Sequence, residues 1–170
     1  MTDTTRPALV GIVMGSDSDL GVMEAAVAML KHFDIPFDIT VASAHRSPAR
    51  AVDYASGAAA RGMKVIIAGA GHAAHLAGVL AAHTILPVIG VPIDSSCLQG
   101  MDALLSTVQM PPGIPVATVS IGKSGAKNAA ILAAQMLALA DPTLAGRLAT
   151  YKKEMAEQVD EKAAKLKAKF

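Results

Sequence analysis

Between Lys64 and Asp94 the sequence contains no charged side chain, and this stretch, residues 65–93, most limits how the chain can fold. A run of about 20 apolar residues would span a bilayer as a helix. Here the run is interrupted by glycines and two prolines, and it contains three histidines, which are expensive to place at membrane depth. A transmembrane helix is therefore disfavoured, and we expect the stretch to form buried elements of a globular fold.

The composition excludes several functions. The chain of 170 residues has a formal net charge of +1 and no Trp, so it lacks the positive field and the aromatic surface that favour nucleic-acid binding. Its single cysteine, Cys97, cannot form an intrachain disulfide or a Cys/His zinc site, and we expect neither a metal nor another cofactor. No secretory signal is visible in Met1–Pro7, which predicts a cytoplasmic protein.

Charged residues make up only 17% of the chain, against about 25% in soluble domains. A lone monomer with so few charges would expose large apolar patches to water. We therefore infer an oligomer.

Five apolar segments, each followed by a loop and then by a helical pattern, repeat along the chain. Ala8–Met14 is apolar throughout, as expected of a strand buried on both faces, and Ser16–Asp19 supplies N-cap groups for the next helix. Such a series predicts an α/β fold with a five-stranded parallel sheet and helices on both faces. The predicted strands are 8–14, 37–42, 64–68, 87–91 and 115–121, and the predicted helices are 20–33, 48–61, 73–83, 100–109 and 124–139.

A last helix is predicted from Pro142, and it becomes densely charged after Tyr151. A charged run of this kind is typical of a solvated helix or of a helix that packs against a partner. No linker or internal repeat interrupts the chain. We therefore predict one domain over residues 1–170, with a core at about 8–140 and a terminal helix at about 142–168.

In an open parallel sheet, ligands bind at the carboxyl ends of the strands, so the loops that follow the strands hold the candidate residues. The first of these loops contains Ser16, Ser18 and Asp19. Its hydroxyls and free N–H groups at a helix start can bind an anion, and Asp19 can accept hydrogen bonds from sugar hydroxyls. The same residues are ordinary helix caps, and for this loop alone capping is the simpler interpretation.

The second loop places His45 next to Arg46, directly before a helix start marked by Ser47 and Pro48. An imidazole beside a guanidinium contributes little to packing, and histidine is the side chain that most readily exchanges protons near neutral pH. The pair therefore favours a functional role over a structural one.

The third loop matches the pattern G-x-G-x-x-A at Gly69, Gly71 and Ala74, which is typical of a dinucleotide site. That pattern normally occupies the first β-α turn of the fold and not the third. The alternative is that the glycines let the backbone approach a smaller substrate, with His72 or His75 facing it.

Other polar residues favour structural roles. A Gly-Lys-Ser sequence ending at Ser124 resembles the end of a phosphate-binding P-loop, but Ala117 occupies the position at which that pattern needs a glycine. We expect Lys123 and Ser124 to cap a helix or to line the edge of a pocket. His32 and His83 lie within or at the end of predicted helices and are expected to be structural.

Several longer motifs occur in an order that resembles one family. They are GSDSD at 15–19, SAHRSP at 43–48, AGAGHAAHLAG at 68–78, LPVIGVP at 86–92 and the segment at 102–130. Together they are similar to the N5-carboxyaminoimidazole ribonucleotide mutases, the class I catalytic subunits of phosphoribosylaminoimidazole carboxylase. The resemblance extends over most of the chain, from about Ala8 to Leu139.

The resemblance implies a flavodoxin-like three-layer fold and a homo-octamer whose active sites are shared between neighbouring subunits. It also implies an isomerase of purine (IMP) biosynthesis. In that reaction a carboxylate moves from the exocyclic nitrogen of an aminoimidazole ribonucleotide to carbon 4 of the ring, without metal, ATP or biotin.

The family's roles can be carried over to the positions that match. His45 matches the catalytic histidine, which is expected to act as general acid and base. Arg46 matches a residue that binds substrate, and the first loop matches the part that binds phosphate and ribose. The residues expected to bind substrate are Ser16, Ser18, Asp19, Ser43, Arg46, Gly71 and His75.

Two positions depart from the family's usual GGAAHLPG, because His72 stands where glycine is common and Ala77 where proline is common. A histidine would be strained there if the backbone needed a positive φ, so we treat His72 as a candidate ligand and not as a catalyst. Two alternatives stay open, a direct carboxylase that uses carbon dioxide and a flavodoxin-like module that binds a nucleotide. The combination of AHR and AAH motifs favours the mutase over the carboxylase.

Overall fold

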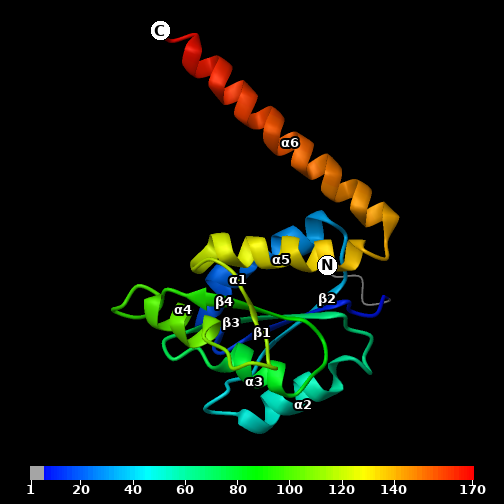
Figure 1. Ribbon diagram of the computed structural model, residues 1–170, viewed down its shortest axis with the longest axis vertical. Helices are drawn as coiled ribbons and strands as arrows, with labels where there is room; N and C mark the ends of the chain where they lie inside the picture. Colours follow the sequence, from blue (N-terminus) through cyan, green and yellow to red (C-terminus); the bar gives the residue numbers. More distant parts are fainter. Residues whose placement is uncertain (1–5) are drawn as a thin grey trace. The chain divides into compact units, whose positions relative to one another are not determined.

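The computed structural model describes residues 6–170, and it confirms the predicted alternation of strands and helices (Figure 1). Five strands alternate with α-helices along most of the chain, and a long α-helix ends it. The elements are β1 (Val10–Met14), the short 3-10 helix η1 (Asp17–Asp19), α1 (Leu20–His32), β2 (Phe37–Val41), α2 (Pro48–Ala58), β3 (Val65–Gly71), α3 (Leu76–Ala82), β4 (Val88–Ile93), α4 (Met101–Val108), β5 (Ala117–Thr118), α5 (Gly122–Ala138) and α6 (Pro142–Lys167).

The five strands form one parallel sheet in the order β2-β1-β3-β4-β5, as predicted for an α/β fold. From β1 the chain first places β2 on one side and then crosses over to place β3 on the other. The loops that leave β1 and β3 therefore diverge, and a crevice opens between them at the carboxyl ends of the strands. This is the position at which an open α/β sheet binds its ligand.

The uncharged stretch at 65–93 forms the centre of this sheet. All residues of β4 are buried, as are the first five of β3, so neither strand has a face that could carry charge. Helix α3 connects the two strands and buries Leu76, Ala77 and Leu80. The absence of charge thus follows from burial on both faces of a parallel sheet.

Helices cover both faces of the sheet (Figure 1): α1 and residues 122–133 of α5 lie on one face, and α2 and α3 lie on the other. Gly90 in β4 shows how closely the second layer packs. A Cβ at this position would lie 2.3 Å from Cγ2 of Thr107 in α4 and 3.3 Å from Cβ of Ala77 in α3. Helices α3 and α4 therefore approach the same face of β4.

Several predicted boundaries were wrong. The fifth strand was expected over 115–121 but contains only Ala117 and Thr118, because it is an edge strand that pairs with two residues of β4. The third strand continues to Gly71 instead of ending at residue 68, and the following helix begins at Leu76 instead of residue 73. Residues 69–75 therefore form the end of a strand and a loop, and they bring the third loop to the crevice.

The described chain divides into two compact units, residues 6–133 and residues 134–170. The second unit contains α6, whose N-cap is Asp141: its carboxylate accepts hydrogen bonds from the N–H groups of Thr143 and Leu144 at 2.9 and 3.0 Å. Pro142 occupies the first turn, where its missing N–H is tolerated. After Tyr151 every residue is exposed, as expected for the charged run. Across residues 6–170, none of the helices combines the length and the apolar character needed to cross a membrane.

Candidate active site

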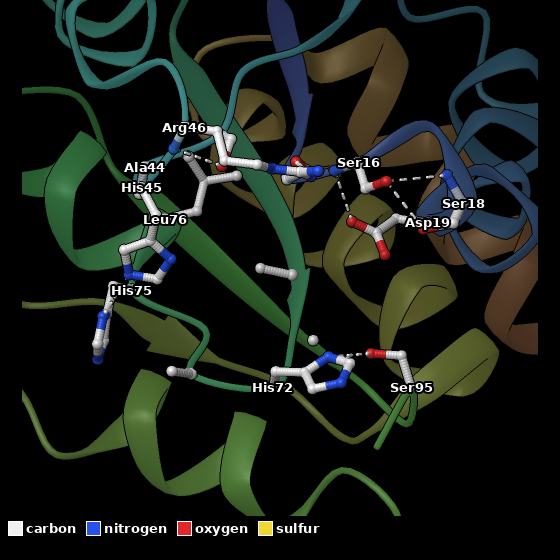
Figure 2. A pocket seen from close by; sticks show the side chains of 15 residues that line it. Ser16, Ser18, Asp19, Ala44, His45, Arg46, His72, His75, Leu76 and Ser95 are labelled. Atoms are coloured by element: carbon white, nitrogen blue, oxygen red, sulfur yellow. Dashed lines mark hydrogen bonds between the residues drawn. The ribbon is translucent and has the colours of Figure 1, made fainter.

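One cavity of about 550 Å³ lies at the carboxyl ends of the strands, within residues 6–133 (Figure 2). Its wall comes from the loops that follow β1, β2, β3 and β4. All eight residues predicted to form the site line this cavity, so the structure brings the whole predicted set together. The lining residues are Gly15, Ser16, Ser18, Asp19, Ser43, Ala44, His45, Arg46, Ala70, Gly71, His72, Ala73, His75, Leu76 and Ser95.

The first loop is folded by its own hydrogen bonds. Ser16 caps η1, where its Oγ accepts from the N–H of Ser18 at 3.4 Å, and Asp19 Oδ2 accepts from the N–H of Ser16 at 3.0 Å. The hydroxyl of Ser18 donates to Ser16 Oγ at 2.9 Å. The capping interpretation is thus confirmed for Ser16 and Asp19. Because the same loop lines the cavity, its hydroxyls cap the helix and also face the space where a ligand would lie.

Asp19 is the buried carboxylate of this loop, with 5% of its surface exposed. Burial raises the pKa of the Asp19 carboxyl above its ordinary value of 3.8. Hydrogen bonds from the N–H groups of Ser16 and Gly15, and the positive charge of Arg46, act in the opposite direction. Asp19 is therefore held in a fixed position as a hydrogen-bond acceptor beside a cation.

The second loop directs Arg46 toward the first loop. The guanidinium Nη2 donates to the carbonyl oxygen of Gly15 at 3.3 Å, and the N–H of Arg46 donates to Ser43 Oγ at 3.1 Å. Ser43 is itself fixed, since its N–H donates to Ser47 Oγ at 2.9 Å. A guanidinium beside the hydroxyls of the first loop is suited to a phosphate. One side of the cavity therefore has the donors that an anion such as phosphate requires.

His45 and His75 come from different loops and meet in the cavity. Nε2 of His45 lies 2.8 Å from Nδ1 of His75, and the two rings are nearly perpendicular at 84°. One ring nitrogen must donate and the other accept, so the proton position on one ring fixes that on the other. Figure 2 shows this pair on a different side of the cavity from Asp19 and Ser18.

His72 and Ser95 form a separate pair in the cavity. Nδ1 of His72 lies 3.1 Å from Ser95 Oγ. His72 has a φ of 54°, in the left-handed region. The departure from GGAAHLPG raised the prospect of a strained backbone at this position, and the positive φ shows that strain. Sequence reasoning did not select Ser95, although its place two residues after a buried strand was a usable signal.

The glycines of the third loop are explained by packing. A Cβ on Gly69 would lie 2.5 Å from the sulfur of Met23, and a Cβ on Gly71 would lie 1.8 Å from Ser95 Oγ. These positions lack side chains because protein atoms already occupy the space. The G-x-G-x-x-A pattern therefore has a structural cause that needs no dinucleotide.

The polar residues expected to be structural, or to cap a helix or line the edge of a pocket, lie outside the cavity wall: they are His32, His83, Lys123 and Ser124. Sequence reasoning missed the apolar part of the wall, which is formed by Ala44, Ala70, Ala73 and Leu76. Small apolar residues are so frequent in this sequence that composition gives no signal for them. Within residues 6–170, no group of three or more His, Cys, Asp or Glu side chains is arranged to hold a metal ion.

The strand order and the polar cavity at the carboxyl ends of β1 and β3 define a flavodoxin-like α/β protein with a candidate ligand site at the point where the strand order reverses. Comparison of the sequence with protein families is more specific. A family model described as AIR carboxylase matches residues 9–158, and the chain belongs to this family.

Individual relatives agree with that assignment. The N5-carboxyaminoimidazole ribonucleotide mutase of Pyrococcus horikoshii is 57% identical over 158 residues, which cover 93% of this chain and 88% of the relative. The phosphoribosylaminoimidazole carboxylase of Candida glabrata is 52% identical over 98% of this chain, but the match spans only 29% of that longer protein. Among solved structures, the crystal structure of Treponema denticola PurE superimposes with a TM-score of 0.85 and 33% identity, covering 94% of this chain and 99% of the other.

Proposed function

We propose that this chain is an N5-carboxyaminoimidazole ribonucleotide mutase of de novo purine biosynthesis. It moves a carboxylate from the exocyclic nitrogen of the aminoimidazole ribonucleotide to carbon 4 of the ring. The observation that carries the proposal is that a guanidinium with a hydroxyl-rich loop and a pair of histidines face one cavity of about 550 Å³. The match to mutases over nearly the whole chain supports the same conclusion.

The ribonucleotide is bound by the first two loops. Arg46 and the hydroxyls of Ser16 and Ser18 take the phosphate, because a guanidinium and O–H donors satisfy its oxygens. Asp19, fixed by the N–H of Ser16, accepts from a ribose hydroxyl. Ser43 supports Arg46 through its bond to the backbone N–H. The base is then directed away from this anion site, toward the remainder of the cavity.

The proton balance of the reaction requires one group that donates and later accepts. When the bond between the exocyclic nitrogen and the carboxylate breaks, carbon dioxide leaves and the nitrogen takes a proton from His45. Carbon 4 then attacks carbon dioxide through the electrons of the ring, and His45 removes the proton from carbon 4. The net proton change is zero, so a single imidazole suffices. His75 is hydrogen-bonded to His45, so it orients the His45 ring and shares a proton with it.

The apolar part of the wall has a role in the same sequence of steps. Ala44 and Leu76, the chain neighbours of His45 and His75, line the cavity beside the histidine pair (Figure 2). Carbon dioxide is small and apolar, and a wall of this kind holds it next to the ring instead of releasing it to solvent. Keeping it in place avoids the entropy loss of recapture.

The direct carboxylase is the second candidate, and the relative named phosphoribosylaminoimidazole carboxylase is the observation in its favour. Turnover of the carboxylated and the uncarboxylated ribonucleotide at low bicarbonate decides between the mutase and the carboxylase. A mutase converts N5-carboxyaminoimidazole ribonucleotide at a rate independent of bicarbonate. Product formed from the uncarboxylated ribonucleotide, at a rate that rises with bicarbonate, would support the carboxylase. Tight binding of NAD or FMN without turnover of either ribonucleotide would instead support a nucleotide-binding module.

We also propose that the chain works as a homo-octamer with active sites at subunit interfaces. Support comes from four exposed apolar side chains, one just before α4 and three on it. Leu98, Met101, Leu105 and Val108 are 60%, 52%, 51% and 46% exposed. Residues 101, 105 and 108 share one face of the helix. An apolar column of this kind is typical of a protein interface. A single domain over residues 1–170 and a cytoplasmic location stay predictions.

A further inference from the structure

A third group of polar side chains lies in the cavity, apart from Arg46 and from the histidine pair. It consists of His72, directly after β3, and Ser95, two residues after β4. Figure 2 shows both side chains on the side of the cavity away from Arg46, with the bond between His72 Nδ1 and Ser95 Oγ drawn across them. The steps described above give this pair no role.

The backbone of His72 is unusual for a residue with a side chain. Among residues 6–170, three residues other than glycine have a positive φ, namely Asp34, His72 and Gln99, and only His72 lines the cavity. Glycine adopts this conformation without strain, whereas a residue with a Cβ does so at a cost in stability. Strain of this kind concentrates at ligand sites, which points to a use for the imidazole.

The neighbouring residues hold the pair in one arrangement. A Cβ on Gly71 would lie 1.8 Å from Ser95 Oγ and 3.2 Å from the carbonyl oxygen of Ile93. Gly71 thus leaves the space that the Ser95 hydroxyl occupies, and the hydroxyl is brought within reach of the His72 ring. The pair is therefore set by the backbone of two loops as well as by its own hydrogen bond.

The substrate of the proposed reaction carries two anionic groups, a phosphate and the carboxylate that moves. The first two loops account for the phosphate, and the pair His45 and His75 accounts for the protons. We propose that the Ser95 hydroxyl, positioned by His72, binds the carboxylate. When Nδ1 of His72 carries a proton it donates to Ser95 Oγ, which leaves the hydroxyl proton of Ser95 free to donate to a carboxylate oxygen. Ser95 is then the contact, and His72 is a positioning residue. This inference rests on the proposed function.

Calorimetry with two ribonucleotides tests the assignment. The first is 4-carboxyaminoimidazole ribonucleotide and the second is the same molecule without the carboxylate. Ser95→Ala and His72→Gly should each weaken binding of the carboxylated ligand about tenfold, the effect of losing a hydrogen bond to a charged group. Binding of the uncarboxylated ligand should change less than about twofold.

Three comparisons separate positioning from folding. His72→Gly should unfold at a temperature no lower than the wild type, because glycine accepts the φ of 54°. His72→Asn should restore binding of the carboxylated ligand to within about threefold of wild type, because Asn tolerates this backbone and its amide can donate to Ser95. Ser56→Ala is the matched control, since Ser56 is an exposed serine of α2 that does not line the cavity.

Each other outcome overturns the assignment. Equal loss of affinity for both ligands would place the pair against the shared ribonucleotide, and unchanged affinity for both would mean that the pair does not bind substrate. A wild-type protein that binds neither ligand would overturn the proposed function itself. If the carboxylate assignment alone fails, the wild type still binds both ligands and turns over normally, and only the pattern of affinities in the variants differs from that expected.

Discussion

Nε2 of His45 lies 2.8 Å from Nδ1 of His75, so two loops of the sheet edge are joined by one hydrogen bond between imidazoles. When Nε2 of His45 carries the proton, it donates a hydrogen bond to Nδ1 of His75. The proton of a neutral His75 is then on Nε2. The position of the proton on His45 is therefore coupled to the tautomer of His75.

Replacement of His45 should abolish most turnover. We expect His45→Asn to lower kcat for N5-carboxyaminoimidazole ribonucleotide by about 10²- to 10⁴-fold, the usual contribution of a general acid or base. His75→Asn should have a smaller effect, since an amide keeps a hydrogen bond to His45. His83→Asn is the control, because His83 is exposed at the end of α3 and outside the cavity. Steady-state rates measure all three, and near-normal turnover by His45→Asn would remove its catalytic role.

Arg46 should affect substrate binding more than the chemical step. Arg46→Ala is expected to raise KM at least tenfold, because it removes the cation that faces the phosphate. Arg50→Ala is a matched change four residues away: Arg50 Nη2 donates to Thr40 Oγ1 at 3.0 Å, and Arg50 does not line the cavity. Its KM should stay within about twofold of wild type. Equal changes in both variants would indicate a general loss of positive charge and not a phosphate contact.

The buried carboxylate of Asp19 predicts a pH dependence of stability. Its pKa is raised in the folded protein by burial, whereas in the unfolded chain it returns to its ordinary value of 3.8. The folded state therefore binds this proton more readily, and ionised Asp19 lowers stability above the folded pKa. As pH falls through that pKa, the penalty is relieved.

Asp19→Asn removes this titration and tests the sign. The unfolding free energy of Asp19→Asn, taken relative to wild type, should decrease as pH is lowered from 7 toward 4. Urea denaturation at several pH values measures the difference, and Asp17→Asn, on the exposed neighbour, should show no comparable trend. A difference that grows on acidification would contradict the burial argument.

Two glycines should respond oppositely to alanine. A Cβ on Gly125 would lie 1.6 Å from the carbonyl oxygen of Ser120, a backbone atom that cannot turn away, so Gly125→Ala should destabilise by about 2 kcal/mol or more. Gly21 is exposed in α1 with no atom within 4 Å of its would-be Cβ, so Gly21→Ala should stabilise by about 0.5–1 kcal/mol. Urea unfolding of the two variants gives both values. Stabilisation by Gly125→Ala would show that Ser120 can move.

The sequence predicted the sheet and the loops of the site because their signals are local. Buried strands such as Val10–Met14 are apolar runs, and the start of α2 is marked by Pro48 in its first turn. The edge strand β5 was overestimated, since its length depends on how much of β4 is available for pairing. The pairing of His72 with Ser95 was not predictable, because it depends on the missing Cβ of Gly71 and on the approach of two loops across the sheet edge.

The apolar column on α4 should determine assembly. Ala103 and Thr107 are buried on the opposite side of the helix, so Leu105 can be changed without opening the interior. We expect Leu105→Glu to lower the mass measured by light scattering at micromolar concentration from that of an octamer, because a charge placed at an apolar interface is not solvated there. Ile85→Glu makes the same change at a residue that is 96% exposed outside α4, and it should leave the mass unchanged. A wild-type protein that is monomeric under these conditions would exclude the octamer, and an octameric Leu105→Glu would place the interface elsewhere.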